Sequence, residues 1–122
     1  ANNTQFEAIA RKIVEGMDLS VQEVSVKNDS TILILAAPPE DEASRRSPRR
    51  LYILVQIERN LDPVSENRVR IFQETMKEKN AGKGILMTTG DILPAAESYA
   101  SQRPIELYDS KKMVEYVRGA VT

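Results

Sequence analysis

The spacing of hydrophobic residues changes along the chain, and the first pattern is helical. Apolar side chains recur at the i, i+3, i+4 and i+7 positions that form one face of an amphipathic helix. These residues are Phe6, Ile9, Ala10, Ile13, Val14 and Met17. Thr4 and Glu7 fit a capping box at the start of this helix, and Gly16 lies near its end.

Short apolar segments follow, and their β-branched content predicts three strands. The first runs from Leu19 to Val26 and ends at a turn, KNDS. The second, Thr31 to Ala37, is continuously apolar, which is typical of a central strand. A polar loop from Pro38 to Arg50 separates it from the third strand, Leu51 to Arg59.

The second half of the chain alternates between helical and strand patterns. A helix from about Ser65 to Lys79 is predicted, with Ser65 as its N-cap and Gly82 as its stop. Its apolar stripe consists of Val69, Phe72 and Met76. The next elements are a strand (Gly84 to Thr89), a short helix that begins at Pro94, a strand (Ile105 to Asp109) and a closing helix with Met113, Val114 and Val117 inward.

The predicted order is therefore αβββαβαβα, an α/β fold. Strands joined by turns pair antiparallel, whereas strands joined by helices pair parallel. We expect a mixed sheet with helices on both faces.

Composition limits the chemistry that this chain can perform. Its 122 residues suit one domain, 1–122, and 41% of them are hydrophobic, enough for a core. The chain has no cysteine and no histidine, which excludes thiol catalysis, zinc knuckles and serine–histidine triads. No apolar run approaches the roughly 20 residues needed to cross a membrane, so we expect a cytoplasmic protein. The missing initial methionine favours a fragment of a larger one.

The sequence ILVQIERN, from Ile53 to Asn60, carries polar residues at the end of a predicted strand. Side chains two apart on a strand share a face, so Gln56 and Glu58 are expected to project together, with Arg59 on the opposite side. Carboxylates, lysine, tyrosine or a hard metal ion are the remaining catalytic options.

Five stretches, in this order, resemble the Mrr-type restriction endonuclease family of the PD-(D/E)XK nuclease superfamily. They are FEAIARKIVEGM, KNDSTILILAA, VQIER, AGKGILMTTGDI and AAESYASQRPIELYDSKKMVEY. The resemblance covers nearly the whole chain and implies a restriction-endonuclease-like fold. The segment KGILMTTG followed by IELYD is its most specific part.

The family's catalysis requires a metal-binding Asp, a Gln or Glu, and a Lys two residues later, usually with Mg²⁺. The resemblance places these roles on Leu33, Gln56 and Glu58, so only the Gln is retained. Many relatives place a glutamate of the opening helix near the metal, which would be Glu7 here; the alternative for Glu7 is the capping box. The resemblance therefore predicts a degenerate site without a cofactor, or Mg²⁺ if nuclease activity remains.

Two other groups could contact nucleic acid. Arg45, Arg46, Arg49 and Arg50 form a local basic cluster suited to phosphate, although they could simply neutralise the acidic half of their loop. Thr88 and Thr89 end a predicted parallel strand, where ligands collect in α/β folds, but turn chemistry explains them as well. A weaker cluster, Lys77, Lys79 and Lys83, also fits a solvated helix end.

We therefore expect a catalytically inactive nuclease-like domain that binds DNA or RNA, or an assembly module of a nucleic-acid-processing protein. One alternative is a dimerisation or protein-interaction module without nucleic-acid binding. Another is an active metal-dependent endonuclease with a rearranged site built from Glu7, Gln56 and Glu58. No membrane partner is expected.

Overall fold

The computed structural model describes residues 3–28, 30–38, 52–59 and 62–112. Its elements follow the predicted order: α1 (Asn3–Glu15), β1 (Ser20–Asn28), β2 (Thr31–Ala37), β3 (Tyr52–Glu58), α3 (Glu66–Glu78), β4 (Ala81–Thr88), α4 (Pro94–Ser101) and β5 (Ile105–Tyr108). A final helical turn begins at residues 110–112, where the Asp109 Oδ1 accepts a hydrogen bond from the Lys112 backbone nitrogen at 3.1 Å. The rest of the predicted closing helix, with Met113, Val114 and Val117, lies outside the described residues.

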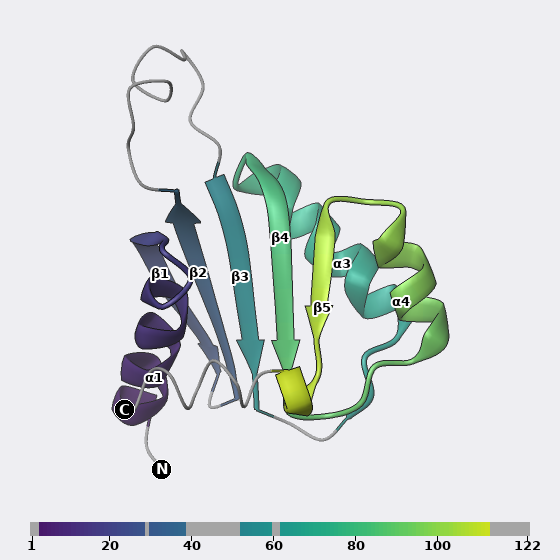
Figure 1. The fold of residues 1–122 in the computed structure, drawn as a ribbon, viewed down its shortest axis with the longest axis horizontal. Helices are drawn as coiled ribbons and strands as arrows, with labels where there is room; N and C mark the ends of the chain where they lie inside the picture. Colours follow the sequence, from purple (N-terminus) through teal and green to yellow (C-terminus); the bar gives the residue numbers. More distant parts are fainter. Residues whose placement is uncertain (1–2, 29, 39–51, 60–61, 113–122) are drawn as a thin grey trace.

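The strands form one five-stranded sheet in the order β1-β2-β3-β4-β5 (Figure 1). β1 and β2 pair antiparallel, as do β2 and β3. The β3–β4 and β4–β5 pairs are parallel, because α3 and α4 return the chain to the same end of the sheet. The expected mixed sheet with flanking helices is confirmed.

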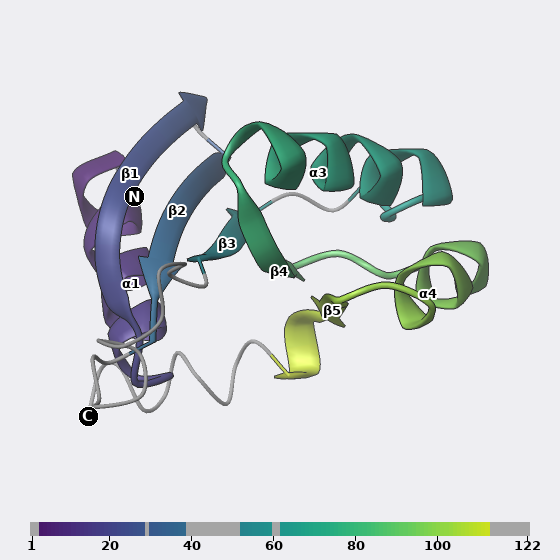
Figure 2. The same cartoon turned by 90° about the horizontal axis from the view of Figure 1, so that it is seen from above.

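The two faces of the sheet are covered by different helices (Figure 2). α1 packs on the face that presents Ile34, Val55 and Ile85, and it contributes Phe6, Ala10, Ile13 and Val14 to that core. α3 and α4 cover the other face, which presents Leu33, Leu54 and Leu86. Neighbouring residues of β2 and β3 alternate between these two cores, as the pleat of a strand requires.

The packing of α3 on the sheet depends on a glycine. Val69, Phe72 and Met76 are buried, as their helical spacing predicted. A Cβ on Gly84 would lie 2.5 Å from Phe72 and 2.6 Å from Met76, so only glycine lets the helix approach β4 this closely. The predicted stop at Gly82 is wrong, because Asn80, with φ of 57°, turns the chain directly into β4.

The start of α1 also differs from the prediction. The helix begins at Asn3, so Thr4 lies inside its first turn instead of preceding it as an N-cap. Glu7 forms an ion pair with Arg11, one turn further along the helix, at 3.4 Å. The predicted capping box therefore gives way to an i, i+4 pair on the helix surface. Within the described ranges, no helix is long and apolar enough to span a bilayer.

Candidate functional site

The pairing of β2 with β3 brings together the positions that the family resemblance singled out. Leu33 lies directly opposite Gln56, and Thr31 lies opposite Glu58. On the other side of β3, Thr88 of β4 pairs with Glu58. The Leu33 side chain belongs to the core beneath α3, so Gln56 and Glu58 project toward the same helix. These residues form one cluster at the carboxyl ends of the parallel strands.

Glu58 is the buried centre of this cluster. Only 2% of its surface is exposed. The Gln56 Nε2 donates a hydrogen bond to the Glu58 Oε1 at 2.5 Å. The Arg68 guanidinium donates to the other carboxylate oxygen and forms an ion pair with it. Both oxygens therefore have a nitrogen partner within the protein, which is what makes the burial of a carboxylate tolerable.

Arg68 reaches Glu58 from the first turn of α3. The Ser65 side chain caps this helix by accepting a hydrogen bond from the Arg68 backbone nitrogen. Upstream, Val64 bridges Ile92, which ties the start of α3 to the segment that follows β4. Arg68 precedes Phe72 by one helical turn, so the two share a face. Its side chain thus lies at the edge of the packed face, with 29% of its surface exposed.

The sequence analysis missed Arg68. A usable signal was present: a glutamate at a predicted strand end on a packed face needs a cation. Arg68 lies on the helical face that includes Phe72 and Met76. Sequence alone does not say which face of the sheet this helix covers, so Arg68 could not be assigned to Glu58.

Glu7 and Arg59 lie on the opposite side of the sheet from this cluster. The Arg59 guanidinium stacks over the Phe6 ring, 4.4 Å from its centroid, on the face covered by α1. Arg59 therefore projects away from Glu58, as strand geometry predicted. Glu7 lies on α1 and is paired with Arg11, so the sheet separates it from Gln56 and Glu58. The described residues contain no group of three or more acidic side chains that could hold a metal ion.

Thr88 ends β4, and Thr89 follows it at the start of the next turn. Thr88 is fully buried, and its hydroxyl accepts a hydrogen bond from the Gly90 backbone nitrogen at 3.0 Å. The Thr89 backbone nitrogen donates to the carbonyl of Glu58 at 3.1 Å. The Thr88 bond is turn chemistry, whereas the Thr89 bond continues the backbone pairing of β3 with β4. Contact of either hydroxyl with phosphate stays a prediction.

The structure describes only one of the two predicted basic clusters. Arg45, Arg46, Arg49 and Arg50 lie outside the described residues. Lys77, Lys79 and Lys83 each lie beside a carboxylate, of Glu74, Glu23 and Glu106 respectively, at 3.0 to 3.6 Å. The three lysines therefore face three different acidic partners and do not form one unpaired basic patch.

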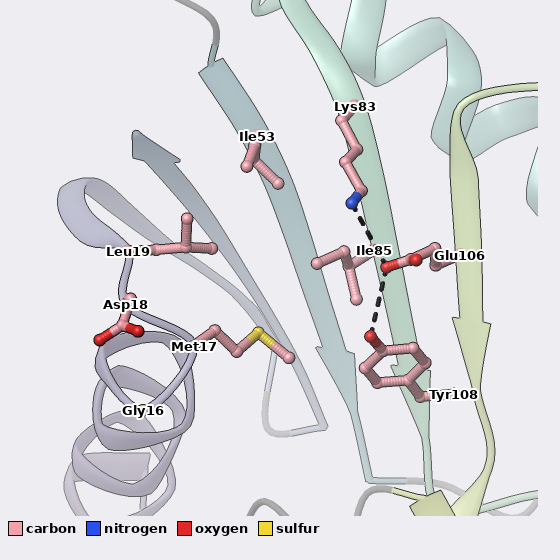
Figure 3. Close-up of a pocket in the computed structure, with 9 residues that line it drawn as sticks. All are labelled: Gly16, Met17, Asp18, Leu19, Ile53, Lys83, Ile85, Glu106 and Tyr108. Carbon is pink, nitrogen blue, oxygen red and sulfur yellow. Dashed lines mark hydrogen bonds and ion pairs between the residues drawn. The ribbon is translucent and has the colours of Figure 1, made fainter. Parts of the chain in front are cut away.

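A cavity of about 350 Å³ lies on the α1 side of the sheet (Figure 3). One wall is apolar and includes Met17 and Leu19 from the turn after α1. The opposite wall is polar: the Glu106 Oε2 lies 3.6 Å from the Lys83 Nζ and accepts a hydrogen bond from the Tyr108 hydroxyl at 3.2 Å. The cavity is separated by the sheet from the Glu58 cluster, so it is not part of that site.

A family model described as a restriction endonuclease, the Mrr catalytic domain, matches residues 1–117. This chain belongs to the Mrr restriction endonuclease family. The resemblance drawn from the five sequence stretches is thereby confirmed. No curated protein sequence matches the chain.

Two solved structures share the Mrr-type fold of this chain. One is the DNA modification-dependent restriction endonuclease AspBHI, with a TM-score of 0.56, 17% identity and coverage of 97% of this chain. The other is the MspJI restriction endonuclease in complex with a 27-mer oligonucleotide, with a TM-score of 0.55, 15% identity and coverage of 93%. The matched region spans only 31% and 27% of those chains.

Mg²⁺ is the metal that the Mrr family implies, and the residues at this site do not fit it. Leu33 offers only hydrocarbon at the position that the family resemblance assigns to the metal-binding Asp. Mg²⁺ prefers oxygen ligands, yet both oxygens of Glu58 already accept nitrogen donors. The Arg68 guanidinium adds a positive charge next to the position that a cation would need.

Proposed function

We propose that this Mrr-family chain is a nuclease-fold domain that binds DNA and does not cleave it. The observation that carries the proposal is the burial of the Glu58 carboxylate and its pairing with Gln56 and Arg68. The resemblance assigns this position to a lysine that stabilises charge on the phosphate; here it is a buried carboxylate held by Gln56 and Arg68.

The charges of the cluster support the loss of cleavage. Glu58 and Arg68 neutralise each other, so the cluster has no net charge with which to attract a metal ion or stabilise a developing negative charge. Leu33 cannot act as a ligand or a base. Each Glu58 oxygen already accepts a nitrogen donor and the residue is only 2% exposed, so the carboxylate has little access to an attacking water molecule.

Two comparisons support nucleic acid as the partner. The chain belongs to a restriction endonuclease family, and MspJI, which shares its fold, was solved with an oligonucleotide. The net charge of −1 gives no general attraction to DNA, so contacts must come from a local cluster. We assign this role to the four arginines of the loop between β2 and β3, Arg45, Arg46, Arg49 and Arg50, because guanidinium groups match phosphate oxygens.

Binding can be tested by fluorescence anisotropy with labelled duplex DNA over a series of salt concentrations. We expect an affinity that falls with salt with a log–log slope of about −3 to −4, since roughly four phosphates would be neutralised. Replacing the four loop arginines with alanine should abolish the binding. The matched control replaces Lys77, Lys79 and Lys83, which are paired with carboxylates, and should retain it. Absence of affinity at low salt would refute DNA binding, and RNA competitors would show whether the partner is RNA.

Cleavage is tested separately, with supercoiled plasmid in Mg²⁺ or Mn²⁺. We expect the plasmid to remain intact. Cleavage that disappears in Glu58→Ala would instead support the alternative of an active endonuclease with a rearranged site.

A role in assembly is the second candidate function. It is favoured by the small share, 31% and 27%, that this fold occupies in the two similar chains. Light scattering that shows a stable dimer, together with no nucleic-acid affinity, would support the protein-interaction module over the DNA-binding domain.

A further inference from the structure

We infer that Arg68 takes the place of a divalent cation in this site: an internal guanidinium provides the counter-charge that the buried Glu58 carboxylate would otherwise take from a bound metal ion. The inference deepens the proposed loss of cleavage. It means that the Glu58 cluster is stable without a metal ion. Its stability then depends on Arg68, which lies outside the positions of the family motif.

The contacts of Glu58 are the first step of the argument. Its carboxylate is almost completely buried, and a buried carboxylate needs a positive partner. Gln56 provides a neutral amide donor to one oxygen, which satisfies hydrogen bonding without compensating the charge. Only Arg68 contributes a positive charge to the described contacts of this carboxylate. Removing Arg68 would therefore leave a buried anion without a counter-ion.

The position of Arg68 is the second step. A guanidinium holds its donors in a rigid plane and remains charged at all physiological pH values, so it is a permanent counter-ion. The Ser65 cap fixes the helical turn from which it extends. Because the guanidinium contacts Glu58 and the Arg68 side chain is 29% exposed, Arg68 extends from the buried carboxylate to the protein surface. Its positive charge beside Glu58 disfavours a second cation there.

The third step is the contrast with Arg70, two residues further along α3. Arg70 pairs with Glu66 at 2.8 Å, and both side chains are about half exposed. This pair also joins a glutamate to an arginine, but its carboxylate is already hydrated by solvent. Removing Arg70 would not create a site that needs a cation, so Arg70 provides a matched control.

The experiment measures metal binding without nucleic acid. Mn²⁺ is titrated into the native chain, Arg68→Gln, Arg68→Lys, Arg70→Gln and the double variant Glu58→Gln/Arg68→Gln, by calorimetry. Thermal midpoints are compared in Mg²⁺ and in EDTA. We expect Arg68→Gln to bind Mn²⁺ at least about tenfold more tightly than the native chain, and its midpoint to rise with Mg²⁺. The native chain, Arg68→Lys, Arg70→Gln and the double variant should not respond.

Two results would overturn the inference. One is an Arg68→Gln chain that responds to metal no more than the native chain does. The other is native binding of Mn²⁺ that disappears in Glu58→Gln. If Arg68→Gln is unfolded in EDTA, recovery of the fold by Mg²⁺ supports the inference, and failure to recover contradicts it. Because no DNA is present, this outcome is independent of the test of DNA binding.

Discussion

Two arginines of α3, Arg68 and Arg70, each pair with a glutamate, and the two pairs differ in burial. Glu58–Arg68 joins the end of β3 to the first turn of the helix, with the carboxylate side chain 3% exposed. Glu66–Arg70 lies on the helix surface, with both side chains about half exposed. A hydrogen bond to the Glu66 carboxylate, together with the attraction between the charges, raises the pKa of Arg70 above its ordinary value.

The comparison shows that burial of the carboxylate, and not the identity of the two paired residues, determines how much stability is lost when the pair is broken. An exposed pair exchanges easily with water, so its loss changes little. A buried carboxylate has no such substitute, so its partner becomes indispensable. The end of β3 also contacts the other helical layer, since Arg59 stacks on Phe6 of α1. Residues at the end of β3 therefore connect the sheet to helices on both faces.

The largest effect is expected from Arg68→Ala, because it leaves Glu58 buried and without a counter-ion. We expect the free energy of unfolding to fall by about 3 to 5 kcal/mol at neutral pH in the absence of divalent metal. Urea denaturation followed by circular dichroism provides the measurement. A loss no greater than that of Arg70→Ala would show that burial does not distinguish the two pairs.

A smaller loss is expected from Glu58→Ala, which removes the other member of the same pair. Arg68 is partly exposed, so its freed guanidinium can be hydrated, whereas a freed Glu58 cannot. We expect a loss of about 1 to 3 kcal/mol, including the donor of Gln56 that loses its acceptor. The same denaturation series tests this order, and a larger loss for Glu58→Ala than for Arg68→Ala would contradict it.

The sequence predicted the elements of this region well and their relation across the sheet only in part. Periodicity gave α3 with its Ser65 cap and its buried stripe, because these depend on local spacing. Strand alternation placed Gln56 with Glu58 and placed Arg59 on the other face. The family resemblance singled out Leu33 and Gln56, and the structure shows that they pair directly across β2 and β3.

The remaining features depend on three-dimensional arrangement that local spacing does not contain. Glu7 was grouped with Gln56 and Glu58 as one option, but α1 covers the opposite face. Arg68 was missed because its partner lies ten residues away, across a strand-to-helix connection. The placement of Glu7 and the pairing of Arg68 both depend on which face of the sheet each helix covers. An amphipathic pattern shows only that a helix has a buried face.

Replacing both members of the buried pair by methionine should nearly restore stability. Glu58→Met/Arg68→Met removes the buried charge together with its partner, and hydrophobic residues of similar size are often neutral at such sites. We expect a free energy of unfolding within about 1 kcal/mol of the native value, well above that of Arg68→Ala. If the double variant is as unstable as Arg68→Ala, the loss comes from packing around Arg68 and not from an unpaired carboxylate.

The smallest effect is expected from Glu66→Ala at the exposed pair. The Glu66 carboxylate is already hydrated, and the Arg70 guanidinium can retain its contact with the Tyr99 ring, whose centroid lies 4.6 Å away. We therefore expect an unfolding transition that is hard to distinguish from the native one, and that becomes indistinguishable when salt screens surface charge. The measurement is a thermal melt at low and high salt, alongside Arg68→Ala. A large loss that persists at high salt would mean that Glu66 supports α3 by some means other than charge, and the contrast between the two pairs would then no longer rest on burial alone.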